Sequence, residues 1–195
     1  MDEVLATPLC APGLRVPLNS LSLPVTLREA EFYFPVEKAN WWSVSRILTA
    51  HRSAVNGDNA LAVPKLSRPM LEGMMHGFID LIFEHDGRFY VADYKSTHLG
   101  DTFTGYSFNA LAHNNQHHLY DLQYLLYALA LHRFLTVSKP DYDIHRHLGG
   151  VFYLYVRGMH PDNRGSEGVF YTPLAAELIL ALDAAFKGEN REVAL

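Results

Sequence analysis

Residues 77–96 read GFIDLIFEHDGRFYVADYKS. Two runs rich in β-branched and aromatic residues flank Asp86-Gly87, a pattern that predicts a β-hairpin closed by a two-residue type I′ turn. Such a turn fixes the strand pairing and places Asp80 directly opposite Asp93. Opposed residues on one face have Cβ atoms roughly 5 Å apart, and like charges at that distance are destabilising. The hairpin is therefore expected to bring two carboxylates together, and another group must offset their repulsion.

Two groups can offset this repulsion. Lys95 lies two residues beyond Asp93, and so on the same strand face. A divalent cation held between the two carboxylates would supply the rest of the compensation. Carboxylate oxygens are hard ligands that suit Mg²⁺, or Mn²⁺ in its place. Together these groups outline the site of a metal-dependent phosphodiesterase.

The alternative is that the two aspartates face solvent and carry no function, as isolated strand aspartates often do. Apolar residues share the strand face of each aspartate: Phe78 and Ile82 for Asp80, Phe89 and Val91 for Asp93. An unpaired charge within such a stripe is strongly unfavourable, which argues against this alternative. A proton shared between two buried acids is a second alternative. A neighbouring lysine instead favours ionised oxygens and a hard cation.

A helix is predicted from about residue 114 to 135, where leucines recur at helical spacing: Leu122, Leu125, Leu126 and Leu129. Tyr120, Gln123 and Tyr127 form a second stripe at i, i+3 and i+7. This stripe is either boundary packing on the sheet or a row of side chains that faces the carboxylates. Three histidines lie just before it: His113, His117 and His118. Because no cysteine or further histidine accompanies them at a fixed spacing, a zinc site is not expected.

The other segments complete a mixed α/β layer fold, with a central sheet flanked by helices. Strands are expected at 29–36, 150–156 and 168–172, and helices at 43–51 and 174–186. Loops are expected at 56–69 and, over the site, at 97–109. Residues 1–26 contain four prolines without periodicity and are interpreted as a linker, which leaves 27–190 as the folded domain.

Composition limits the function. The chain has 195 residues, of which 49% are hydrophobic, and its net charge is −5. This charge disfavours an autonomous DNA binder, because neutralisation of phosphates drives most non-specific affinity, so neighbouring domains are expected to deliver the strand. Four basic residues are interpreted as solvated surface rather than phosphate contacts: Arg46, Arg52, Lys65 and Arg68. A single Cys10 and the lack of a long apolar run favour a cytoplasmic protein.

Several motifs of the sequence resemble those of a known nuclease family. Asp80, twelve intervening residues and then Asp93-Tyr94-Lys95 resemble the PD-(D/E)XK nuclease signature, with Ile79 where that family commonly has proline. Five longer strings resemble the C-terminal nuclease domains of the RecB family, from about Glu29 to about Phe186: GFIDL (77–81), DYKS (93–96), YDLQY (120–124), LALHR (129–133) and GGVFYL (149–154). The resemblance implies a restriction-endonuclease-like core.

The resemblance also implies roles for individual residues. Asp80, Asp93 and the backbone carbonyl of Tyr94 would be metal ligands, and Lys95 would position or activate the attacking water. Glu29 matches an acidic position of the family, and Glu31 is the alternative on the same strand face. The Gln-x-x-x-Tyr motif that follows the catalytic lysine in these nucleases is matched by Gln123 and Tyr127.

The implied activity is that of a Mg²⁺-dependent exonuclease domain of a RecBCD-type exonuclease V, which degrades linear DNA from single-stranded ends in double-strand break repair and homologous recombination. The chain has no P-loop motif. The implied partners are therefore a helicase domain of the same polypeptide or complex, RecC-like and RecD-like subunits, and a RecA-like recombinase, with no membrane.

Two other functions are compatible with the sequence. The family takes a histidine ligand from an upstream helix, which has no match in this sequence. A non-catalytic domain or fragment of the same fold would dock on RecC-like or RecA-like partners, bind no metal, and fold unchanged when Asp93 is replaced. A free-standing restriction-like or repair endonuclease would cut closed circular DNA.

Overall fold

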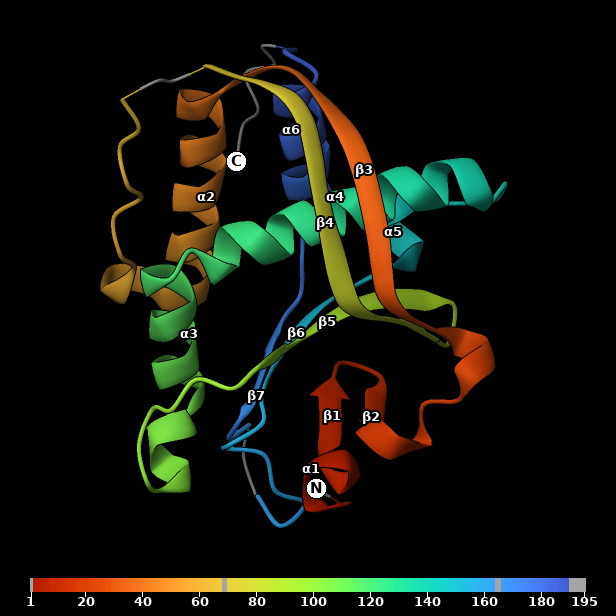
Figure 1. Cartoon of the computed structure of the whole chain (residues 1–195), viewed down its shortest axis with the longest axis vertical. Coiled ribbons are helices and arrows are strands. Elements are labelled where there is room, and N and C mark those ends of the chain that lie inside the picture. The colour runs from red at the N-terminus through yellow and green to blue at the C-terminus, as the bar shows by residue number, and fades with distance from the viewer. Residues whose placement is uncertain (1, 68–69, 164–165, 190–195) are drawn as a thin grey trace.

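The computed structural model describes residues 2–67, 70–163 and 166–189. Its centre is a five-stranded sheet in the order β3-β4-β5-β6-β7. The strands are β3 (Thr26–Asn40), β4 (Met70–His85), β5 (Arg88–Lys95), β6 (Leu148–Tyr155) and β7 (Val169–Thr172). The β5–β6 pair is parallel and the other neighbouring pairs are antiparallel. The prediction of an α/β fold with a mixed central sheet is thus confirmed (Figure 1).

The β4–β5 hairpin closes as the sequence predicts. Asp86 and Gly87 have φ angles of 49° and 77°, and positive values at both positions are what a type I′ turn requires. The strand pairs run from His85↔Arg88 to Leu81↔Ala92. Asp80 and Asp93 are next in this register, at the fork where β4 and β5 separate.

β4 is longer than expected. It begins at Met70 rather than near Gly77, because it pairs with β3 all the way from Asn40↔Met70 to Thr26↔Phe83. The two strands form a long ribbon that extends beyond the rest of the sheet and crosses in front of α4 in Figure 1. Residues 70–76, for which the sequence analysis names no element, are therefore part of the strand.

Helices cover one face of the sheet. They are α2 (Trp41–Asn56), α3 (Phe108–His117), α4 (Tyr120–Ser138), α5 (Ile144–His147) and α6 (Ala176–Phe186), joined by short 3-10 turns η3 (Gly57–Asn59) and η4 (Phe103–Tyr106). The larger apolar core lies between this layer and the sheet. The strands β6 and β7 and the helix α6 lie close to their predicted ranges. Within the described ranges, no helix is both long and apolar enough to cross a bilayer.

Two helix predictions need correction. The helix expected at 43–51 is the longer α2, which Asn40 caps by accepting a hydrogen bond from the Trp42 N–H at 2.9 Å. The single helix expected over 114–135 is two helices, because Leu119 between them has a φ of 57°. A hydrogen bond from Arg52 Nη2 to the Gln116 carbonyl, 3.0 Å long, holds this break from α2. The loop expected at 97–109 contains η4 and the start of α3.

The first residues do not behave as a linker. They form α1 (Asp2–Ala6), the hairpin β1 (Pro8–Ala11) and β2 (Leu14–Pro17), and the turns η1 (Leu18–Ser20) and η2 (Leu23–Val25). Leu9, Leu14 and Leu18 are buried in a second apolar cluster with residues of the sheet, including Phe83 and Phe152. This N-terminal unit, red in Figure 1, covers the sheet face opposite the helices. A short hairpin with proline at both ends lacks the periodicity that identifies longer elements in a sequence.

Candidate active site

Asp80 lies at the fork where the hairpin strands separate. Its Oδ2 accepts a hydrogen bond from the Tyr94 backbone N–H at 2.9 Å. The β3–β4 pairing runs through Arg28↔Leu81 and Ala30↔Ile79, which places Glu29 opposite Asp80 between them. Glu29 has a φ of 49°, in the left-handed region that is uncommon for residues other than glycine. The fork therefore gathers a carboxylate from each of two neighbouring strands.

A groove of about 650 Å³ opens on this fork. Its polar lining comprises Asn19, Thr26, Arg28, Glu29, Asp80 and Tyr94, and its apolar lining comprises Leu5, Leu18, Leu21 and Leu81. The N-terminal unit thus forms one wall of the groove, and the fork forms the other. Arg28 is the cationic side chain of this lining.

Asp93 is deeply buried, with 4% of its surface exposed. Its Oδ2 lies 2.6 Å from Lys95 Nζ, and the Lys95 side chain is itself 11% exposed. Burial raises the pKa of Asp93 above its ordinary value, the neighbouring Lys95 opposes this shift, and the charge of Asp80 adds to it. Two acids and a lysine therefore interact at the fork, as the hairpin register predicts.

Lys95 is held from several sides. Its Nζ donates a hydrogen bond to Gln123 Oε1 at 2.9 Å. The same nitrogen lies 3.9 Å from the centre of the Tyr120 ring and 4.7 Å from that of the Tyr153 ring. Contacts of an ammonium group with aromatic faces are attractive and restrict its position. Lys95 thus has a defined location beside Asp93.

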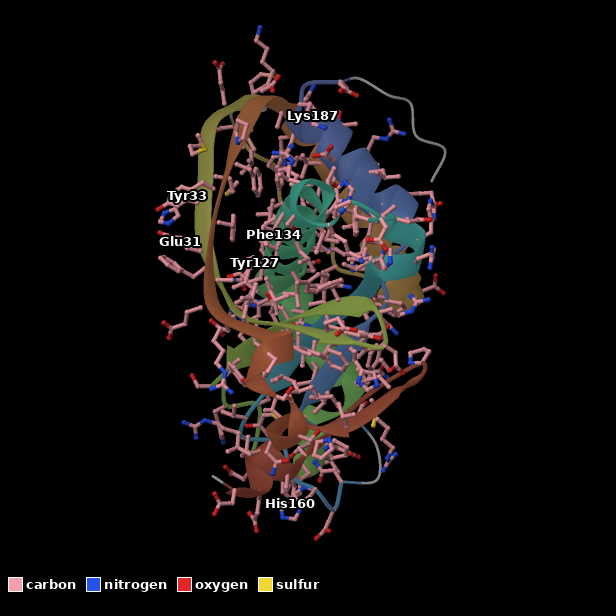
Figure 2. All side chains as sticks on the ribbon, turned by 90° about the vertical axis from the view of Figure 1, so that its right-hand side faces the viewer. Glu31, Tyr33, Tyr127, Phe134, His160 and Lys187 are labelled. Atoms are coloured by element: carbon pink, nitrogen blue, oxygen red, sulfur yellow. The ribbon has the colours of Figure 1, made fainter. Side chains whose placement is uncertain are left out.

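Gln123 connects this lysine to two tyrosines. Its Oε1 accepts a second hydrogen bond, from the Tyr153 hydroxyl at 2.8 Å, and its Nε2 donates to the Tyr127 hydroxyl at 2.8 Å. Burial, together with the charge of Asp93, raises the pKa of Tyr127 to about 12. Figure 2 shows Tyr127 on the inner side of the β3–β4 ribbon. The structure therefore brings Gln123 and Tyr127 to Lys95 rather than leaving them as boundary packing.

Tyr153 was missed in the sequence analysis. It stands beside Asp93 in the parallel β5–β6 register. The only signal in the sequence is its place in an aromatic strand. That strand's partner cannot be read from local pattern, because parallel strands are joined by long crossovers.

Glu31, the alternative to Glu29, lies elsewhere. Its carboxylate accepts a hydrogen bond from the Tyr33 hydroxyl and lies 3.1 Å from His76 Nε2. Figure 2 shows Glu31 and Tyr33 projecting from the outer side of the ribbon. Of the two glutamates, Glu29 is the one that shares a groove with Asp80.

The oxygens at the fork fit a hard divalent cation. Asp93 Oδ2 is buried and accepts no hydrogen bond of good geometry. Asp80, Glu29 and the Tyr94 carbonyl add further oxygen atoms. Oxygen ligands are the type that Mg²⁺ and Mn²⁺ prefer. In the part of the chain that the structure describes, no three His, Cys, Asp or Glu side chains converge closely enough to hold a metal by themselves. A cation here would therefore rely on the backbone carbonyl and on substrate or water oxygens as well.

Comparison with known proteins agrees with this geometry. The family model of the PD-(D/E)XK nuclease superfamily matches residues 29–190. The chain is 39% identical over 194 residues to the RecBCD enzyme subunit RecB of Escherichia coli (strain K12), covering 100% of this chain and 16% of that protein. It is 37% identical over 187 residues to RecB of Haemophilus influenzae, covering 95% of this chain and 15% of the relative. RecB of Mycobacterium tuberculosis is 36% identical over 170 residues. The chain thus spans about a sixth of the length of the first of these relatives.

Proposed function

The chain belongs to the PD-(D/E)XK nuclease superfamily, and from this premise we propose that it is a Mg²⁺-dependent exonuclease domain of the exodeoxyribonuclease V type that hydrolyses phosphodiester bonds of linear DNA. The observation that carries the proposal is the position of Lys95. Its ammonium contacts Asp93 and Gln123 at once, beside the fork that holds Asp80. A cation-binding pair of acids with a fixed lysine suits a reaction in which negative charge develops on phosphate.

The residues that would hold the metal are Asp80, Asp93, Glu29 and the Tyr94 carbonyl. When bound, a divalent cation polarises the scissile phosphate and lowers the pKa of a coordinated water. Lys95 would stabilise the charge that develops on the phosphate or orient the attacking water, since its location is fixed by Asp93 and Gln123. PD-(D/E)XK nucleases generally use divalent metal ions, and the choice of Mg²⁺, with Mn²⁺ as a substitute, rests on the all-oxygen donor set.

The same proposal includes the substrate and the partners. The relatives of Escherichia coli and Haemophilus influenzae are named as subunits of RecBCD enzymes, and a net charge of −5 suits a domain that receives its strand from elsewhere. We therefore place the reaction in the cytoplasm during break repair and recombination. There a helicase domain would deliver single-stranded ends, RecC-like and RecD-like subunits would assemble around it, and a RecA-like recombinase would use the product.

The test is digestion of an end-labelled linear single strand by the 195-residue chain with Mg²⁺, with Mn²⁺ and with EDTA. The Asp93→Ala variant tests the site, and Asp101→Ala is the matched control because the Asp101 side chain is 96% exposed. We expect metal-dependent digestion by the wild type and by Asp101→Ala, and none by Asp93→Ala.

A closed circular single strand of the same composition separates the nuclease classes. Sparing of the circle supports an exonuclease, whereas cutting of the circle would replace the proposal with an endonuclease. If neither the wild type nor Asp101→Ala digests linear DNA, hydrolysis by this chain is refuted in favour of a non-catalytic docking domain.

A further inference from the structure

Three histidines that the proposed chemistry does not use lie on α3 (His113 and His117) and at its C-cap (His118). His113, His117 and His118 are all exposed, and their rings form a row. The His113 and His117 rings are 6.5 Å apart with 18° between their planes, and the His117 and His118 rings are 4.8 Å apart, edge to face. The His118 ring then stacks on Tyr120 at 5.4 Å and 26°. Four rings thus follow one another along the surface.

The row ends at the candidate active site. The Tyr120 ring, its last member, lies 3.9 Å from Lys95 Nζ. From His113 to Lys95, each step is therefore a contact between neighbouring side chains. A ligand that lay along these rings would reach the lysine that we assign to the phosphate.

The three imidazoles of the row are exposed rather than packed in the core. The helix packs through its other side, where Leu111, Ala112 and three polar residues, Asn114, Asn115 and Gln116, are buried. Among the described residues, the three imidazoles take part in ring contacts, and no hydrogen bond or ion pair of theirs is observed. Three exposed imidazoles that lead to the partly buried Tyr120, which packs against the core, form a surface available for a ligand.

The charge around the row fits a polyanion. The sequence has no acidic residue from Thr102 to Tyr120. The elements that pack against α3 are α2, α4, β7 and η4, and they contribute one acid, Asp121. That carboxylate is 1% exposed and is paired with Arg52. The chain as a whole has a net charge of −5. This surface exposes no acidic residue of α3 or of the elements packed against it, so it does not repel a phosphate backbone.

We propose that His113, His117, His118 and Tyr120 form a stacking track that leads a single DNA strand to Lys95. The proposal rests on the proposed nuclease function and names the path of its substrate. Aromatic side chains bind single strands with little sequence preference, because every base has a face on which a ring can stack. Imidazole N–H groups can also donate hydrogen bonds to phosphate oxygens. Such a track suits an enzyme that must accept any sequence.

The test is binding of a fluorescein-labelled oligo-dT in EDTA, where no cleavage occurs, measured by fluorescence anisotropy. The triple variant His113→Gln, His117→Gln, His118→Gln keeps polar side chains and removes the rings. His145→Gln is the control, because that side chain is 60% exposed on α5 and lies outside the row. Thermal unfolding of each variant verifies that it is folded. We expect the triple variant to bind about tenfold or more weakly, and His145→Gln to bind as the wild type does.

Equal binding by the wild type and the triple variant would overturn the track, as would a wild type that does not bind the strand. The proposed function fails separately. A wild type that binds the strand through these rings but does not cleave it with Mg²⁺ or Mn²⁺ supports the track and refutes the nuclease. A wild type that cleaves while its triple variant binds equally well refutes only the track.

Discussion

Asp93 is a carboxylate that folding removes from water and places near a second acid. Because burial raises its pKa in the folded state, the folded chain holds the Asp93 proton more tightly than the unfolded chain does. The stability that this group contributes is therefore present in full below its ordinary pKa of 3.8, and is lost as the pH rises through the higher folded-state value. Without metal, ionisation of Asp93 therefore destabilises the fold.

Asp93→Asn should therefore be more stable than the wild type in metal-free buffer at pH 7. The gain should shrink as the pH falls toward 4, because the wild-type carboxyl then takes up its proton. Thermal unfolding at several pH values measures this difference, with Asp101→Asn as the exposed control. A variant that is less stable at pH 7 would show that the contact with Lys95 outweighs burial.

Gln123 determines where the Lys95 ammonium lies, through hydrogen bonds to Lys95, Tyr153 and Tyr127. Gln123→Ala should lower the rate of DNA cleavage about 10- to 100-fold, because small misplacements of a reacting group have effects of that size. Tyr153→Phe removes one of these hydrogen bonds and should cause a smaller loss. Single-turnover cleavage with saturating Mg²⁺ measures both, and a wild-type rate in Gln123→Ala would exclude this positioning role.

At the scale of elements, Arg52 joins α2 to the break between α3 and α4. It is 1% exposed, and it binds the Asp121 carboxylate and the backbone carbonyls of Leu61, Ala62 and Gln116. The interpretation of Arg52 as solvated surface was wrong, because the side chain is buried. Its burial could not be predicted, since its partner Asp121 lies 69 residues away along the chain. No local pattern contains that information. Arg68, interpreted in the same way, lies outside the described residues.

Arg52→Met should lower the free energy of unfolding by about 3–5 kcal/mol, because it leaves the buried Asp121 carboxylate without its cationic partner. The double variant Arg52→Met, Asp121→Leu should recover much of that loss, since an apolar pair of similar volume is often as stable as a buried ion pair. Urea unfolding of the two variants measures the difference. A double variant less stable than the single one would show that the carbonyl contacts of Arg52 matter more than the ion pair.

His51 makes the packing of α2 against α4 sensitive to acid. Its Nε2 lies 2.6 Å from the Tyr124 hydroxyl in the core, and burial, with a smaller effect of Arg52, lowers its pKa from 6.5 to about 4. The unfolded chain therefore takes up a proton before the folded chain does. The stability that His51 contributes is present in full above pH 6.5 and is lost as the pH falls from there toward 4.

The free energy of unfolding should fall by up to about 3 kcal/mol across this interval through His51 alone. His51→Gln keeps a polar group near the Tyr124 hydroxyl and should flatten the pH dependence, whereas the exposed control His145→Gln should not. Urea unfolding at pH 7, 6, 5 and 4 compares the three proteins. An unchanged slope in His51→Gln would assign the acid sensitivity to other groups.

At the scale of the whole molecule, the features that could be predicted from the sequence are those determined by residues close together along the chain. The turn at Asp86-Gly87 fixes a register through local chemistry, so the fork of Asp80 and Asp93 followed from it. The contact of Lys95 with Gln123 could be predicted only through the family resemblance. Its contact with Tyr153 could not be predicted without the folded sheet. The N-terminal unit could not be predicted, because its short strands become buried only when the second face of the sheet exists.

This unit should be needed for stability, since it covers apolar side chains such as Phe83 and Phe152. Leu9 is 0% exposed in that cluster, so Leu9→Ala should lower the free energy of unfolding by about 2–5 kcal/mol. Leu66→Ala is the control, because Leu66 is 43% exposed and should cost little. Since the unit also forms a wall of the groove beside Asp80, the Leu9 variant should bind oligo-dT more weakly near its melting temperature. Wild-type stability in Leu9→Ala would mean that the sheet does not depend on this cover.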